Sequence, residues 1–289
     1  MNDIAIFGGF GPDDLDSYFE LRRHYRINFS IDAESKLRGD GGFDFEKIKL
    51  YLTQLLRFDD PKEAGVEQTR AFLQQSRRED WHTTTIDGRQ FMVHPAVFNP
   101  ALFPSTSWFA DIVRKEVSGV ADFCEVGCGA GVIAALVAAA NPDIRVVATD
   151  INPFATENAK VNADALHIGN RLEVANGDVL DGVAKERLFD AIFWALPFGF
   201  LDPGVTVSLE ERQVFDPGYR SIRKFFATGK EHLKPGGRLL LGFSSDLGHQ
   251  ELLNDIAKEH GMRLRTVAET TMQETESVSF EVLEAVSEK

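Results

Sequence analysis

The chain of 289 residues is 43% hydrophobic and 26% charged, which is ordinary for a globular protein with one sizeable core and a smaller accessory region. Its formal net charge of −14 repels phosphate backbones and therefore disfavours DNA or RNA as a partner. The best candidate basic patches, residues 22–26 and 77–78, are flanked by acidic residues, and we interpret them as solvated helix faces.

The start of the chain, residues 1–4, lacks the positive region and the long apolar run of a secretory signal. The longest apolar run, residues 132–140, is far shorter than the roughly 18 residues that a membrane-spanning helix needs. The only two cysteines, Cys124 and Cys128, provide neither a disulfide framework nor a metal-ligand spacing. We therefore expect a cytoplasmic protein that uses no metal and has no membrane partner.

The first ~80 residues predict helices, because apolar residues recur there at helical spacing. The predicted helices cover residues 13–29, 44–58 and about 61–78, and a flexible turn at residues 38–42 separates the first two. Tyr25, on the first helix, is included among the catalytic candidates, because these helices are expected to form a wall of the substrate pocket.

A β-hairpin follows the helical region. Residues 82–86 and 89–94 are rich in β-formers, and Asp-Gly at 87–88 is the two-residue hairpin signal. We assign residues 1–95 to a helical substrate or lid domain that includes this hairpin, and residues 96–289 to a second domain.

A helix is predicted from about Thr106, with Ser105 or Ser107 as its N-cap. From residue 120 onward strands and helices alternate, which predicts an α/β fold with a mostly parallel sheet and helices on both faces. Seven strands are predicted, at residues 122–126, 145–150, 172–176, 190–195, 238–243, 263–268 and 278–286. The last strand alternates apolar and polar residues, as an antiparallel strand late in the sheet would.

Residues 122–131, Asp-Phe-Cys-Glu-Val-Gly-Cys-Gly-Ala-Gly, are the most informative segment. They predict a buried strand that enters an acidic, glycine-rich turn and opens into an apolar helix. Residues without a Cβ atom let backbone N–H groups approach a nucleotide-like ligand closely. The dinucleotide pattern G-x-G-x-x-G needs a small third residue, and Val132 occupies that position here. A plain tight turn between strand and helix is the alternative interpretation.

The string E-x-G-x-G-x-G, from Glu125 to Gly131, resembles motif I of the class I S-adenosylmethionine (SAM) methyltransferases. The layout of helical region, hairpin and Rossmann-like domain is similar to that of the HemK/PrmC-type glutamine methyltransferases and related small-domain enzymes. Their second motif resembles residues 150–153 (Asp-Ile-Asn-Pro), and Lys-Pro-Gly-Gly at 234–237 also recurs there. The second motif continues here through Ala155, Asn158, Ala159 and Asn162. The match is specific from about residue 120 to 243 and architectural before residue 95.

The resemblance implies that SAM is bound at the carboxyl ends of the strands, where open α/β sheets hold their ligands. Glu125 is expected to order the glycine loop and to approach the methionine amino group. Asp150 ends the second strand and can accept hydrogen bonds from both ribose hydroxyls, and a helix N-cap is its alternative role. Asp178 is expected to accept the adenine amino group, with the N–H of Val179 on a ring nitrogen, or else to be a plain turn residue.

The full set of predicted cofactor-binding residues is Glu125, Gly127, Cys128, Gly129, Gly131, Asp150, Ile151, Asn152, Asp178, Val179 and Ala195.

The chain departs from the family after the fourth strand. The family carries Asn/Asp-Pro-Pro-Tyr/Phe there, which holds a planar amide or exocyclic amine, whereas residues 195–198 are Ala-Leu-Pro-Phe. Ala195 has no side-chain acceptor, so a two-point hold on an N–H₂ group is lost. Leu196, Pro197 and Phe198 are the remaining catalytic candidates, and the Phe198 ring either faces the sulphonium or packs at the edge of the sheet. The loop at residues 201–219 is a second expected wall of the pocket.

These observations leave several functions open. The first is a SAM-dependent methyltransferase for a small-molecule or amino-acid-like acceptor. The second is an enzyme that cyclises SAM itself, releasing methylthioadenosine and azetidine-2-carboxylate. Protein glutamine methylation and a non-catalytic, SAM-retaining fold are further alternatives. The sequence does not indicate the acceptor or the oligomeric state.

Overall fold

The computed structural model describes residues 3–6, 28–31, 38–39, 42–43, 66, 69–71, 73–74, 77–273 and 277–287. The chain divides into two compact units, Met1–Ala71 and Phe72–Lys289. The hairpin predicted at residues 82–94 belongs to the second unit, together with the large sheet. The functional boundary near residue 95 stays a prediction.

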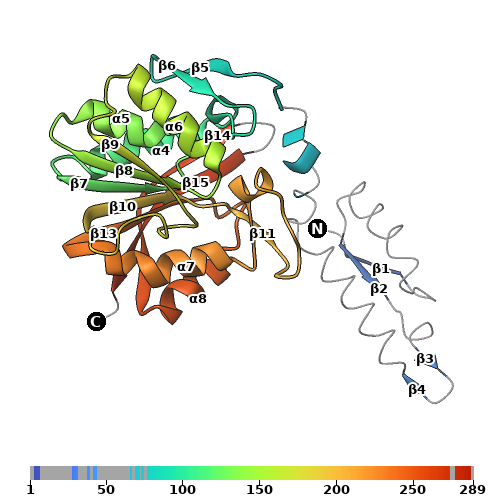
Figure 1. Ribbon diagram of the computed structural model, residues 1–289. Coiled ribbons are helices and arrows are strands. Elements are labelled where there is room, and N and C mark those ends of the chain that lie inside the picture. The colour runs from blue at the N-terminus through green and yellow to red at the C-terminus, as the bar shows by residue number, and fades with distance from the viewer. Residues whose placement is uncertain are drawn as a thin grey trace. The chain divides into compact units, whose positions relative to one another are not determined.

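The first unit contains strands where the sequence predicted helices alone. Strand β1 (Asp3–Ile6) pairs in parallel with β2 (Asn28–Ile31) (Figure 1). Two-residue strands, β3 (Arg38–Gly39) and β4 (Gly42–Phe43), pair antiparallel across the predicted turn. The prediction that the helix at 13–29 extends to residue 29 is wrong, because β-branched and aromatic residues of that segment pair as a strand.

The remaining N-terminal predictions are only partly covered by the described residues. Residues 66, 69–71 and 73–74 are helical, within the helix predicted at 61–78, but residues 77–78 are not. Interpreting Arg77 and Arg78 as part of a helix face is therefore wrong. Tyr25 and the helix predicted at 44–58 lie outside the described residues.

A seven-stranded sheet forms the centre of the second unit, in the order β14-β15-β13-β10-β7-β8-β9 (Figure 1). Its members are β7 (Asp122–Val126), β8 (Arg145–Asp150), β9 (Leu172–Asn176), β10 (Phe189–Ala195), β13 (Leu233–Phe243), β14 (Met262–Gln273) and β15 (Ser277–Ser287). The run from β13 to β9 is parallel, and β15 is antiparallel to both of its neighbours. The predicted α/β fold class and the antiparallel last strand are confirmed.

Helices cover both faces of this sheet (Figure 1). On one face lie α4 (Ser105–Glu116), α5 (Val132–Ala140) and α6 (Pro153–Ala165), and on the other lie α7 (Arg220–Gly229) and α8 (Gln250–Glu259). Strand residues alternate between the two cores, so Phe123 packs in the first and Cys124 in the second. No helix among the described residues is long and apolar enough to cross a membrane.

Shorter elements connect these layers. They are the hairpin strands β5 (His82–Ile86) and β6 (Arg89–Val93), the small parallel pair β11 (Gly199–Leu201) and β12 (Phe215–Pro217), and the 3₁₀ helices η3 (Pro100–Leu102), η4 (Glu211–Gln213) and η5 (Lys230–His232). The predicted N-cap of α4 is wrong. Helix α4 begins directly after Pro104, and no side chain caps it.

The buried carboxylate of Asp122 collects cations at the start of β7. Arg145 donates to it at 2.8 and 2.9 Å, Lys234 at 2.6 Å and Arg187 at 3.0 Å, while the Asp122 side chain is 3% exposed. These hydrogen bonds, that from Arg145 above all, lower the pKa of Asp122 well below its usual range. The cluster connects β7, β8 and β13 at the edge of the sheet where β7 begins.

Replacing Asp122 by Asn should therefore cost about 3 kcal/mol of unfolding free energy at pH 7, because it leaves clustered cations without their buried partner. The pKa is lower in the folded than in the unfolded chain, so this contribution is complete above about pH 4 and is lost as the pH falls further. Urea unfolding of Asp122→Asn against the exposed control Asp143→Asn measures it. Equal stability of the two variants at pH 7 would contradict the role of the cluster.

Candidate active site

The carboxyl ends of β7, β8, β9 and β10 lie at one edge of the sheet. From β7 the chain moves outward to β8 and β9, then returns to form β10 on the other side of β7. Val126 and Trp194 are directly paired where β7 and β10 end. Open α/β sheets bind ligands at such a switch point. The predicted cofactor residues follow these strand ends, so the structure brings them together.

The glycine loop combines tight packing with open space. Gly127, Gly129 and Gly131 all have positive φ, at 63°, 54° and 76°. A Cβ atom on Gly127 would lie 2.5 Å from the Trp194 indole nitrogen, and one on Gly131 would lie 2.8 Å from the Ala159 Cβ atom. A Cβ atom on Gly129 would meet nothing within 4 Å. Two of the glycines therefore permit close packing, while the third faces open space.

Asp150 holds this loop through two backbone hydrogen bonds. Its carboxylate accepts from the N–H of Gly129 at 2.9 Å and from the N–H of Asn152 at 2.8 Å. Burial raises the pKa of Asp150. The alternative role as a helix N-cap is wrong, because the Asn152 side chain caps α6 by accepting from the N–H of Phe154 at 3.0 Å. A carboxylate has about four acceptor positions, so Asp150 retains capacity for a ligand.

Glu125 is buried directly beneath the loop, with 4% of its surface exposed. Its carboxylate accepts from the N–H of Ala134, in the first turn of α5, at 2.7 Å. Burial raises the pKa of Glu125 to about 8, and the nearby charge of Asp150 adds to the effect. In the free protein this carboxyl group is therefore mostly protonated at neutral pH. A cation bound beside it would favour the charged form.

Asp178 forms an ion pair that the sequence did not reveal. The Lys224 ammonium, on α7, donates to Asp178 at 2.7 Å and to Asp181 at 2.6 Å. The Asp178 side chain is 38% exposed, so it is accessible from solvent as well. Val179 has a left-handed backbone with φ of 61°, and its carbonyl accepts from the Thr149 hydroxyl at 2.7 Å. No local signal links Lys224 to Asp178, because they lie on separate elements 46 residues apart.

Two asparagines of α6 hold the hairpin against the glycine loop. The Asn158 amide bonds the N–H of His94 at 2.9 Å and the carbonyl of Met92 at 2.8 Å. Asn162 accepts from the N–H of Met92 and donates to the carbonyls of Met92 and Ala130, each at 2.8 Å. The second-motif asparagines thus have a structural role here, since they supply β6 with the hydrogen bonds that a neighbouring strand would provide.

The segment after β10 is apolar and partly buried. Leu196 is 3% exposed, and its N–H donates to the carbonyl of Gly242 at 2.9 Å. The Phe198 ring packs edge-on to Phe243, with centroids 5.9 Å apart, and lies 6.1 Å from Phe280. Ala195 is half-buried and contributes no polar side-chain atom. The catalytic roles of Leu196, Pro197 and Phe198 stay predictions.

Side-chain hydrogen bonds hold the end of the loop at 201–219, and its role as a wall of the pocket stays a prediction. Its end is held by Tyr219, whose hydroxyl donates to the carbonyl of Phe198 at 2.6 Å and accepts from the N–H of His249 at 2.8 Å. The Asp216 carboxylate accepts from the N–H groups of Ser221 and Ile222, in the first turn of α7. The chain that follows Phe198 is therefore tied back to the sheet.

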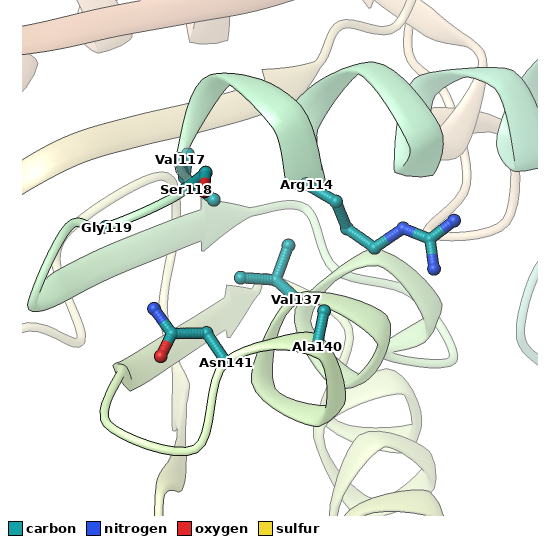
Figure 2. Close-up of a pocket in the computed structure, with 7 residues that line it drawn as sticks. All are labelled: Arg114, Val117, Ser118, Gly119, Val137, Ala140 and Asn141. Atoms are coloured by element: carbon teal, nitrogen blue, oxygen red, sulfur yellow. The ribbon is translucent and has the colours of Figure 1, made fainter.

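A separate cavity lies away from this edge of the sheet. It measures about 300 Å³ and is lined by Arg114, Val117, Ser118, Gly119, Val137, Ala140 and Asn141 (Figure 2). Helix α4 ends just before β7 and α5 just before β8, so this cavity lies at the amino ends of the strands. Arg114 is paired there with Asp87 and Asp111. Among the described residues no group of His, Cys, Asp or Glu is arranged to hold a metal ion.

The contrast between two glycines gives a test of the loop. Gly129→Ala should cost about 1 kcal/mol of unfolding free energy, the price of a left-handed backbone alone. Gly131→Ala should cost about 1–3 kcal/mol more, because its Cβ atom also collides with Ala159. Urea unfolding of both variants measures the difference between the two losses of unfolding free energy. Equal losses would show that the contact between the loop and α6 is not tight.

The raised pKa of Glu125 gives a second test. Its folded-state value of about 8 exceeds the unfolded value of about 4.3, so the stabilising proton is lost as the pH rises between them. Glu125→Gln keeps the hydrogen bond to Ala134 but does not titrate. Its free energy of unfolding should exceed that of the parent by about 1 kcal/mol or more at pH 8 to 9, roughly 2–4 °C or more in Tm, and the gain should vanish below about pH 4, where the unfolded carboxyl group is protonated as well. Parallel melting profiles across this range would contradict a buried, titrating Glu125.

Comparisons with known proteins agree with this geometry. The sequence profile of the family described as "Methyltransferase small domain" matches residues 88–271. Ribosomal RNA small subunit methyltransferase C of Mannheimia succiniciproducens is 29% identical over 175 residues, 60% of this chain and 46% of that protein. Release factor glutamine methyltransferase of Koribacter versatilis is 32% identical over 185 residues, 58% of this chain and 63% of that protein.

Among solved structures, a methyltransferase from Pyrococcus furiosus superposes with a TM-score of 0.51 at 18% identity, covering 70% of this chain and 90% of that chain. At this identity the likeness shows the fold alone. The family profile covers more than half of the sequence, and it includes the glycine loop and the strands around it. The chain belongs to the methyltransferase small domain family, and its fold is that of the class I SAM-dependent methyltransferases.

Proposed function

We propose that the chain binds SAM over the glycine loop and transfers its methyl group to a small-molecule or amino-acid-like acceptor. The open space above Gly129 would receive the ligand. The Asp150 carboxylate would accept the ribose hydroxyls in charge-assisted hydrogen bonds. Asp178 would accept the adenine amino group, and the N–H of Val179 would donate to the ring. Glu125 would face the methionine ammonium, whose charge would lower the raised pKa of that carboxyl group.

The acceptor class follows from one observation, the absence of a side-chain acceptor at Ala195. The family motif that the sequence resembles carries an Asn or Asp at this position, where it holds a planar amide or exocyclic amine. Ala195 and the buried Leu196 cannot hold a planar amide in this way. The net charge of −14 also opposes an RNA substrate. Both facts favour a small acceptor enclosed by apolar surface.

Methyl transfer itself needs little from the protein. The acceptor lone pair attacks the methyl carbon, the carbon–sulphur bond breaks, and the electron pair leaves on the sulphur of S-adenosylhomocysteine. The sulphonium is already an activated leaving group, so alignment and exclusion of water supply most of the catalysis. Phe198, beside the strand end, would contribute its ring face to the cation.

The same missing side chain favours a second candidate, cyclisation of SAM. The amine of SAM is tethered to its own electrophile and needs no external hold. Its lone pair would attack the γ-carbon, the bond from that carbon to sulphur would break, and methylthioadenosine would leave with the electron pair. The nitrogen then loses a proton, giving azetidine-2-carboxylate. Glu125 would be placed to take such a proton, because its carboxyl group is buried directly beneath the glycine loop.

Mass spectrometry of the full chain incubated with SAM separates the two candidates. S-adenosylhomocysteine that forms only when an amine or amino acid is added supports methyl transfer. Methylthioadenosine from SAM alone supports cyclisation. Asp150→Ala should weaken SAM binding by about 10–100-fold in calorimetry, which corresponds to the loss of ~1.5–3 kcal/mol from charged hydrogen bonds. Binding of SAM with neither product formed would contradict both reactions, and unchanged affinity in Asp150→Ala would contradict the cofactor site.

A further inference from the structure

A small cavity of about 50 Å³ lies where the first residues of β5 meet the segment before α4 and the 3₁₀ helix η4. Its polar lining comes from Arg77, Arg78, His82, Glu210 and Gln213. The apolar lining includes Phe98 and Phe103, whose rings stack with centroids 4.1 Å apart. None of these residues is part of the cofactor set described above.

His82 is the unusual member of this lining. Both of its ring nitrogens are buried, and neither has a hydrogen-bond partner among the described residues. A buried polar atom left unpaired costs about 1–3 kcal/mol, so such atoms are rare unless a ligand or water completes them. Two unpaired nitrogens on one ring, at the wall of a cavity, indicate that a polar group belongs there.

The charged side chains that line the cavity, Arg77, Arg78 and Glu210, sum to a positive charge, whereas the chain as a whole is negative. Arg77 pairs with Glu210 at 3.2 Å, which cancels one of the two guanidinium charges. Arg78 is exposed and has no ion pair among the described residues, so its guanidinium is available to a ligand that enters the cavity. On a chain with a net charge of −14, a cavity with an unpaired arginine and an unsatisfied histidine selects an anion.

Hydrogen bonds made by residues that line the cavity connect it to the candidate cofactor site. The carbonyl of Ala96 accepts from the Asn152 side chain at 2.8 Å, and the N–H of Asn152 bonds Asp150. On the other side, the Gln213 side chain accepts from the N–H of Phe98. Gln213 lies in the loop that follows the segment 195–198. The cavity therefore lies between the strand end that carries Asp150 and the loop expected to enclose the acceptor.

We propose that this cavity binds the carboxylate of an amino-acid-like acceptor, with Arg78 and His82 as its hydrogen-bond donors. The proposal rests on the proposed function and names the chemical class of its substrate. A guanidinium matches a carboxylate with two parallel hydrogen bonds, and the imidazole N–H adds a third. A water molecule occupies about 30 Å³ of liquid. The cavity thus suits one planar head group, while the rest of the acceptor extends toward the sulphonium.

A carboxylate fits better than a phosphate group. Phosphate carries more charge and more acceptor oxygens than a carboxylate, and sites for it draw on several cations or a row of backbone N–H groups. Of the two guanidinium groups that line the cavity, that of Arg77 is already paired with Glu210, which leaves the guanidinium of Arg78 alone for the ligand. The planar carboxylate also matches the planar guanidinium, and it needs no further donors than those present.

Histidine NMR of the full chain, saturated with S-adenosylhomocysteine, tests the proposal. The ring signal of His82 is assigned from the variant His82→Gln. Sodium acetate is titrated at constant ionic strength, with acetamide and inorganic phosphate as comparison ligands. Acetate should shift the His82 signal saturably with a millimolar Kd, whereas acetamide should not. Arg78→Gln should weaken the acetate affinity about tenfold, and the matched control Arg89→Gln, an exposed arginine at the hairpin turn, should leave it unchanged.

Several outcomes would overturn the assignment. These are a shift that does not saturate, an equal response to acetamide, tighter binding of phosphate than of acetate, or equal affinities in Arg78→Gln and Arg89→Gln. If acetate binds the free chain but not the chain saturated with S-adenosylhomocysteine, the cavity is part of the cofactor site and does not bind the acceptor. Calorimetry with SAM keeps the two proposals apart. A chain that binds and consumes SAM without any acetate response loses only this inference, and one that does not bind SAM loses the proposed function.

Discussion

Three polar side chains determine the shape of the glycine loop, and the candidate active site depends on that shape. Glu125 bonds the N–H of Ala134, Asp150 bonds the N–H of Gly129, and Asn162 bonds the carbonyl of Ala130. Each bond is largely shielded from water, where an unpaired group would be costly. A loop of glycines has high conformational entropy when free, so these contacts are what keep it in one left-handed path. Two of the three contacts are made by carboxyl groups that burial makes difficult to ionise.

Two buried carboxyl groups with raised pKa values, Glu125 and Asp150, lie beside the glycine loop. Glu125 and Asp150 are both buried and lie close enough for their charges to raise the pKa of Glu125. A sulphonium or ammonium placed against them would favour the ionised form of both carboxyl groups. In the proposed function, a positively charged ligand such as SAM would therefore gain more from this loop than a neutral nucleoside would.

The β5–β6 hairpin is connected to the glycine loop through α6. Its strand β6 is bonded by Asn158 and Asn162 of α6, and Asn162 also holds the loop at Ala130. A displacement of the hairpin would therefore reach the glycine loop through a single side chain. The segment that follows the hairpin carries Ala96, whose carbonyl is bonded by Asn152. Asn152, Asn158 and Asn162 in this way connect the glycine loop, the hairpin and the segment that follows the hairpin.

The sequence by itself determined the fold class, all seven strands of the central sheet, the apolar helix that starts at Val132, and the position of the glycine-rich turn before it. These features depend on local periodicity, strand composition and glycine spacing, which a short window of sequence contains. The sequence did not determine the N-terminal strands, because their apolar residues are spaced as in a helix although the segments pair as strands. It also did not determine the N-terminus of α4. Only the tertiary structure showed the ion pair of Lys224 with Asp178, the capping role of Asn152, and the unpaired nitrogens of His82 beside Arg78. Each of these features depends on contacts between residues far apart in the chain or on the burial of a particular atom. A short window of sequence contains information about neither.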